Sequence, residues 1–347
     1  MKRQSGITVI EILVGLALSL IILAGVMHIF INNKQTYRVQ EAFARLQENG
    51  RFAMHFLTKE LRMAGFTGCA GKIAGPIDDN IADFYPPGNP QGDGDPDEVT
   101  LLNGSGIEGF EHTNLPIQLT EEISLNSADV IPGTDIVRIK RASTTGARVK
   151  NPGGGNPVDA ASIKLDLTTA QGMFATNDYL FVSDCKNASI FVATEITENP
   201  GGQYINIAHG INVNTNSHRE HVYEDDAEVF KLVNTTFYVA YNDADQPALF
   251  RKSLGNANTM HEEELVEGVE DMQLWYGEDM DGDGVPNKYV ESSRVGNWDD
   301  IVAVRVVLQV RSIEDNLTKD PTDYKGNEDR RLRRTFTTSI ALRNQTI

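Results

Sequence analysis

Basic residues are scarce relative to acidic ones in this chain of 347 residues. It has 31 lysines and arginines against 49 aspartates and glutamates, so its formal net charge at pH 7 is −18. A nucleic-acid-binding protein shows a basic stripe, and docking on anionic lipid needs a basic face. The charge therefore argues against direct nucleic-acid binding and against such docking, and it fits a globular body with an acidic surface.

The signatures of common enzyme sites are also missing. The sequence has no Gly-rich phosphate loop, and His261 has no second histidine at the spacing of a zinc-binding helix. The glycines around Ser105 do not have the spacing of a nucleophile elbow. We therefore expect a protein that is not an enzyme.

Cysteine is rare, since Cys69 and Cys185 are the only two in the chain. In an oxidising compartment they could form one disulfide. Such a bridge would close a long loop and would contribute about 4–5 kcal/mol in the chain-entropy model. Two unpaired thiols are the alternative, because the sequence does not show that the two residues are adjacent.

Proline is absent from one long apolar segment near the N-terminus, residues 7–31, and Glu11 is the only carboxylate in it. A helix of this length reaches about 37 Å, enough to span the hydrocarbon core of a bilayer. Lys2 and Arg3 precede the segment. By the positive-inside rule they keep the short N-terminus cytoplasmic and place the remaining chain on the other side.

Two ordinary explanations of this segment are incomplete. A secretory signal peptide has a shorter apolar core followed by a small-residue cleavage site, whereas here the small residue, Gly6, comes before the core. A plain membrane anchor explains the length but not Glu11, since a carboxylate in a membrane helix costs a few kcal/mol on the mildest scales.

Residues 32–65 predict an amphipathic continuation of the same helix, with Gly65 as its C-terminal stop. A short coiled coil is the alternative use of its apolar face. That face is formed by Val39, Phe43, Leu46, Gly50, Ala53, Leu57, Leu61 and Ala64.

Residues 66–347 are rich in β-strand patterns, after a loop region at 66–97. A turn at 242–246 predicts a hairpin between two of the strands. The fold class is therefore α+β, a long N-terminal helix with a membrane half and an amphipathic half, packed on a β-rich globular domain of antiparallel sheet. The expected strands cover 98–102, 135–141, 179–183, 189–194, 203–207, 229–240, 248–253, 301–311 and 335–343.

An acidic segment, residues 279–287, matches the first half of a calcium-binding loop, with carboxylates at alternating positions and a glycine at the sixth. The twelfth position is Val290 rather than glutamate, and no helix pair is evident, so this is not an EF-hand. A loop that binds calcium between two strands and a plain Asp-Gly turn both remain open. The oxygen ligands would come from Asp279, Asp281, Asp283, the Val285 carbonyl and Asn287.

The segment from Gly6 to Glu11, GITVIE, resembles the type IV prepilin motif. This resemblance implies a leader peptide at residues 1–6, cleavage by prepilin peptidase between Gly6 and Ile7, and methylation of the new N-terminus at Ile7. It also implies that Glu11 pairs with an N-terminal amine and sets the register of assembly. An ammonium and a carboxylate can satisfy each other in apolar surroundings where either alone is costly.

Further pieces resemble the PilW family of type IV pilus minor pilins, at residues 37–62, 133–142, 178–194 and 264–284. The resemblance implies a structural protein that helps prime pilus assembly and supports adhesion, twitching motility or DNA uptake. A position at the tip of the pilus is one of the places that it implies for such a protein. Its partners would be other minor pilins, the major pilin, prepilin peptidase and the inner-membrane assembly platform.

The implied location is the inner membrane, crossed once, with the cytoplasmic N-terminus and the globular domain in the periplasm, and then the pilus fibre at the cell surface. A pseudopilin of type II secretion would carry the same N-terminal motif. A membrane-tethered, calcium-binding adhesin that uses the helix only as an anchor is a further alternative.

Overall fold

The computed structural model describes residues 9–68, 77–79, 106–112, 125–126, 128–150, 162–210, 214, 223–254 and 260–344. The chain divides into two compact units. One consists of Met1–Glu48 with Arg311–Arg334, and the other of Asn49–Val310 with Thr335–Ile347.

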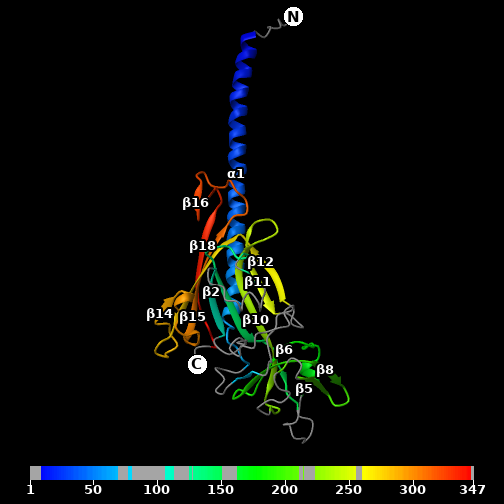
Figure 1. The fold of residues 1–347 in the computed structure, drawn as a ribbon. Helices are drawn as coiled ribbons and strands as arrows, with labels where there is room; N and C mark the ends of the chain where they lie inside the picture. The colour runs from blue at the N-terminus through cyan, green and yellow to red at the C-terminus, as the bar shows by residue number, and fades with distance from the viewer. Residues whose placement is uncertain are drawn as a thin grey trace. The chain divides into compact units, whose positions relative to one another are not determined.

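One helix, α1, runs unbroken from Val9 to Leu61 (Figure 1). Most of the predicted apolar face of its second half is buried, with Val39 half-buried. Phe43 was wrongly included, because it is 42% exposed and Ala42 is buried in its place. The Phe43 ring instead faces the guanidinium of Arg334, 5.6 Å from its centroid. The buried residues of the predicted face are Leu46, Gly50, Ala53, Leu57, Leu61 and Ala64.

In the first unit, the middle of α1 contacts the segment Arg311–Arg334. The Gln35 amide donates to the Asn316 carbonyl at 3.1 Å, and Arg38 lies 3.6 Å from the Glu314 carboxylate. The segment contains a small hairpin of β16 (Thr322–Tyr324) and β17 (Asn327–Asp329).

The largest sheet lies in the second unit and has nine strands. Six of them follow the order β1-β7-β6-β10-β11-β12, β3 and β4 also pair with β10, and β2 pairs with β3. The long strand β10 pairs antiparallel with β11, β3, β4 and β6. The predicted turn at 242–246 joins β10 to β11 and is closed by the Asn242 amide N–H on the Gln246 carbonyl at 2.9 Å. The strands are β1 (Ile77–Asp79), β2 (Ile107–Glu111), β3 (Asp135–Ala142), β4 (Ala147–Arg148), β6 (Tyr179–Ser183), β7 (Ala188–Val192), β10 (Glu228–Tyr241), β11 (Pro247–Leu254) and β12 (Met260–Glu267).

Two further sheets complete this unit. One has the order β14-β13-β15-β18, built from β14 (Lys288–Val290), β13 (Val269–Glu278), β15 (Ile301–Arg311) and β18 (Arg333–Ala341). The other has the order β5-β9-β8, built from β5 (Ser162–Asp166), β9 (Tyr204–Ala208) and β8 (Glu195–Asn199), with the single-turn helix α3 (Leu167–Ala170) after β5.

Within the second unit, the C-terminal end of α1 packs directly on these sheets. The Asn49 amide donates to the Glu267 carbonyl of β12 at 2.9 Å, and the Glu60 carboxylate accepts from Arg141 of β3 at 2.8 Å. After the helix, the Gly65 N–H donates to the Lys140 carbonyl at 3.0 Å. These contacts confirm the predicted α+β fold, in which a long N-terminal helix packs against antiparallel sheets as in pilin-like proteins.

The predicted strands are found with small shifts at their ends, apart from 98–102, which lies outside the described residues, as does most of the predicted loop 66–97. In β15 the first four residues are all buried, and from Val304 onward buried residues alternate with exposed or half-buried ones. Ten strands were missed, and the short strand β1 lies within the segment that was expected to be loop. The missed strands are β1, β2, β4, β5, β8, β12, β13, β14, β16 and β17.

Candidate functional site

The N-terminal motif is only partly described. Glu11 lies in the first turn of α1 with an exposed side chain, whereas Gly6 and Ile7 lie outside the described residues. Cleavage after Gly6, methylation of Ile7 and the register role of Glu11 therefore stay predictions.

The first half of α1 is long and apolar enough to cross a membrane. Its most apolar window has a mean hydropathy of 2.7, and none of that window is buried within the chain. Large apolar side chains such as Ile10 and Phe30 are 72% and 67% exposed. Free apolar surface of this extent needs a partner outside the chain, so the segment fits a membrane anchor or a signal sequence.

The acidic loop 279–287 connects β13 to β14 in a hairpin. The flanking strands pair in register, so that Glu278 lies opposite Lys288, and their side chains form an ion pair at 2.7 Å. The backbone N–H of Asn287 donates to the Glu278 carbonyl at 2.8 Å, which closes the loop at its base. The hydrogen bonds from Lys288 and from the Gly296 N–H lower the pKa of Glu278. The loop is thus held by strands on both sides, as expected for a site that is not an EF-hand.

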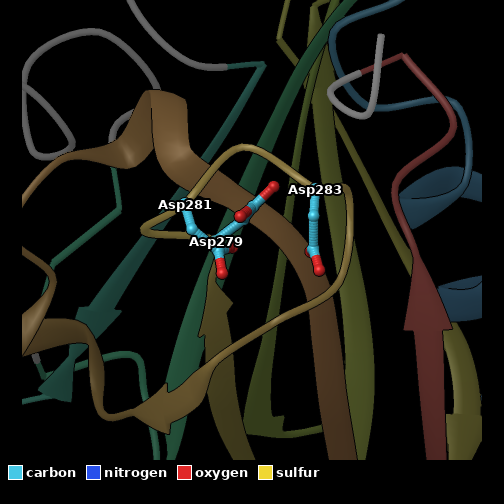
Figure 2. Close-up of side chains that lie close together, drawn as sticks. All are labelled: Asp279, Asp281 and Asp283. Carbon is cyan, nitrogen blue, oxygen red and sulfur yellow. The ribbon is translucent and has the colours of Figure 1, made fainter.

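Within this loop the three aspartates converge. One carboxylate oxygen each from Asp279, Asp281 and Asp283 lies within 4.8 Å of the others, and Figure 2 shows the side chains on one turn of chain. Asp279 is half-buried and the other two are exposed. Three carboxylates at this distance are a set of hard oxygen donors, so the triad could bind a metal ion of the calcium type.

Backbone N–H groups organise the triad. Asp279 accepts from the Gly282 and Gly284 N–H groups, both at 2.8 Å, and hydrogen bonding to Gly284 is the main cause that lowers its pKa. Both glycines have positive φ, 75° and 81°, a conformation that side-chain-bearing residues rarely adopt. The turn therefore keeps Asp279 ionised, which is a condition for binding a cation.

The other two predicted ligand residues, Val285 and Asn287, take part in hydrogen bonds within the loop. The Asn287 side-chain oxygen accepts from the Met280 N–H at 2.5 Å, and the Val285 N–H donates to Asp283 at 2.8 Å. These bonds also occur in a plain Asp-Gly turn. The geometry thus supports a three-carboxylate site, and ligation by Val285 or Asn287 stays a prediction.

The predicted disulfide cannot be followed in full. Cys185 lies between β6 and β7 with φ of 70°, and its N–H donates to the Ser183 hydroxyl at 3.0 Å. Cys69 lies outside the described residues, so its pairing with Cys185 stays a prediction.

Sequence reasoning missed the Glu278 and Lys288 pair at the base of the acidic loop. A signal was available, because these opposite charges flank the nine residues of the loop symmetrically. In an antiparallel hairpin such positions face each other across the two strands.

Residues 236–344 match the model of a protein family described as Type IV Pilus-assembly protein W, PilW. The match begins in β10 and includes the acidic loop. No curated protein and no solved structure matches the chain. The family is one of pilus-assembly proteins rather than of enzymes. The chain therefore carries, at residues 236–344, the PilW domain of a type IV pilus-assembly protein family.

Proposed function

We propose that this chain is a minor pilin of a type IV pilus that is processed by prepilin peptidase and helps prime pilus assembly. The observation that carries the proposal is the PilW match at residues 236–344 in a chain that begins with the prepilin-like motif Gly6 to Glu11. Its work is structural. The apolar half of α1 joins it to lipid and then to neighbouring pilins, and the β-rich body presents a surface.

The exposed apolar half of α1 supports this proposal. The large apolar side chains of residues 9–31 are more than half exposed, so the described chain leaves this surface largely uncovered. In the inner membrane, lipid covers it, and in a filament the equivalent helices of other minor pilins and the major pilin do so. Glu11 in this half then meets the N-terminal amine created at Ile7, which neutralises its charge.

Two experiments test the proposal. Mass spectrometry of the protein purified from cells should find a methylated N-terminus at Ile7, and a chain that still begins at Met1 would refute processing. Deletion of the gene should reduce the number of surface pili, and a copy with Glu11→Ala should not restore it. Normal piliation with defective protein secretion would instead identify a pseudopilin of a type II secretion system.

We also propose that the Asp279, Asp281 and Asp283 triad binds calcium and so rigidifies the hairpin between β13 and β14. Calorimetry with calcium should show binding to the purified chain, and Asp281→Asn should weaken it at least tenfold. Asp245→Asn is the matched control, since Asp245 lies in the other hairpin turn, between β10 and β11, outside the triad. Absence of heat and of any change in thermal stability would leave the segment as a plain turn.

A further inference from the structure

A second site lies on the large sheet, away from the N-terminal motif and the acidic loop. A cavity of about 690 Å³ is lined by residues of β10, β11 and β12 and of the turn at 242–246. These three strands are neighbours in the sheet (Figure 1). This volume is in the range of pockets that take small ligands or single side chains of a partner.

Aromatic rings form part of the wall. Tyr238 and Phe250 stack on each other, with centroids 5.8 Å apart and planes inclined by 19°. Tyr241 also lines the cavity and is 55% exposed, so one ring is available to a ligand. The Tyr238 hydroxyl donates to the Glu262 carboxylate, which links the aromatic wall to the acidic one. Aromatic faces next to carboxylates are favourable surroundings for an organic cation.

The charges of the lining are unbalanced. Among the described residues that line the cavity, four are acidic and Lys252 is the only basic one. The Lys252 side chain is about nine-tenths buried, and its amine lies 3.8 Å from Glu262. Burial, assisted by the charge of Asp129, raises the pKa of Glu262, as expected where carboxylates lack enough positive charge nearby. The acidic residues are Asp129, Asp243, Glu262 and Glu264.

The spacing of these carboxylates favours an extended cation over a metal ion. Among the described residues, the triad of the acidic loop has three acidic side chains close enough to share one ion, and the cavity lining forms no such group. Glu264 is oriented by the Asn242 amide, which donates to it at 3.0 Å. The negative charge of the lining is therefore spread over several separate carboxylates, and the Tyr238 ring lies beside one of them.

We propose that this cavity binds a lysine or arginine side chain presented by a basic peptide segment of a protein partner. The long apolar stem of such a side chain would lie on the Tyr241 and Phe250 rings, and its charged end would meet Glu264 and Glu262. The inference does not depend on the pilus role, since it uses only contacts within the second unit.

The test uses the full chain in detergent and two fluorescent probes, a short glycine peptide with two arginines and the same peptide with two glutamates. Fluorescence anisotropy should show saturable binding of the arginine peptide at least tenfold tighter than that of the glutamate peptide. Glu264→Gln should weaken binding of the arginine peptide at least threefold, and Tyr241→Ala should do so as well.

Glu198→Gln is the matched control, because Glu198 is an exposed glutamate on β8 outside the cavity. This variant should bind the arginine peptide with the same affinity as the unmodified chain. Circular dichroism and melting curves would show that the variants are folded. Equal affinity of folded Glu264→Gln, Glu198→Gln and unmodified protein would overturn the proposal. Equal binding of the arginine and glutamate peptides would also overturn it. A neutral oligosaccharide that binds through Tyr241, while the arginine peptide does not bind, would overturn it as well.

Discussion

Both ends of α1 contain leucines and glycines, and these residues meet opposite surroundings at the two ends. Leu20, in the first half, is 64% exposed, whereas Leu57, near the C-terminal end, is fully buried. The glycines differ in the same way, since a Cβ added at Gly25 would meet nothing within 4 Å and one added at Gly50 would lie 2.2 Å from the Phe336 ring. One continuous helix therefore has one end that needs a partner outside the chain and one end that is part of the domain core.

The largest difference is expected for leucine truncation. Leu57→Ala should lower the free energy of unfolding by about 3 kcal/mol, because it removes buried methyl groups and leaves a cavity. Leu20→Ala should change it by less than about 0.5 kcal/mol, since it removes exposed surface. Urea unfolding of the detergent-solubilised chain measures both, and similar losses for the two variants would contradict the comparison.

The ion pairs of α1 allow a second test. Glu60 and Arg141 form a pair at 2.8 Å whose side chains are 9% and 12% exposed, whereas Glu41 and Arg45 form an exposed pair at 2.7 Å. Glu60→Gln should cost about 2 kcal/mol, because it leaves a guanidinium partly buried without its counter-charge. Glu41→Gln should cost about 0.3 kcal/mol, the value of an exposed pair four residues apart on a helix. Denaturation at low and high salt would show screening of the Glu41 effect and little change for Glu60.

The glycines give a smaller effect, which is expected at one end of α1 only. Gly50→Ala should destabilise the domain by about 1–2 kcal/mol, because the new methyl group displaces Phe336 and this outweighs the better helix propensity. Gly25→Ala should leave the unfolding of the domain unchanged and should increase helicity slightly, measured by circular dichroism. If Gly50→Ala were stabilising, the contact with Phe336 would be looser than described.

The sequence predicted the buried and exposed parts of α1 well, and it predicted the strands of the sheets less well. Apolar residues every three or four positions identify a helix face, but a pattern of that kind does not exclude a neighbour such as Phe43, which the structure places outside the buried face. The strands β15 and β18 were found because apolar and polar residues alternate along much of each strand. β12 was missed because its sequence, MHEEELVE, has the acidic composition of a surface segment.

The candidate sites could likewise be predicted only where their residues are close together in sequence. Glu11 and the aspartate triad were found because each depends on residues close together in sequence. Tyr238, Phe250 and Glu262 of the cavity come from three strands, β10, β11 and β12, and the strand register places them together. Asp129 joins them from a turn before β3. No local pattern in the sequence carries that register.

Two carboxyl groups of the second unit, Asp279 and Asp135, have pKa values shifted in opposite directions. Asp279, in its turn, has a lowered pKa, whereas burial raises the pKa of Asp135 on β3 to about 7, with contributions from Glu111, Asp271 and Glu291. The Leu274 N–H donates to Asp135 at 2.7 Å and opposes this rise. The folded protein therefore holds a proton on Asp135 at pH values where the unfolded chain has lost it.

The sign of the pH effect follows from this difference. The contribution of Asp135 to stability is fully present below about pH 4 and is lost as the pH rises towards 7, because the folded state then binds more protons than the unfolded state. Asp135→Asn keeps a hydrogen-bond acceptor for Leu274 without a charge. It should therefore raise stability at pH 8 relative to the unmodified chain by about 1 kcal/mol, less than the full shift implies because the group is half-buried.

At pH 4.5 the unmodified chain and the Asp135→Asn variant should be nearly equal in stability. Melting temperatures across this range, with Asp279→Asn as the control for a carboxylate of lowered pKa, measure the difference, and a constant gap between the curves of Asp135→Asn and the unmodified chain would show that Asp135 is ionised throughout.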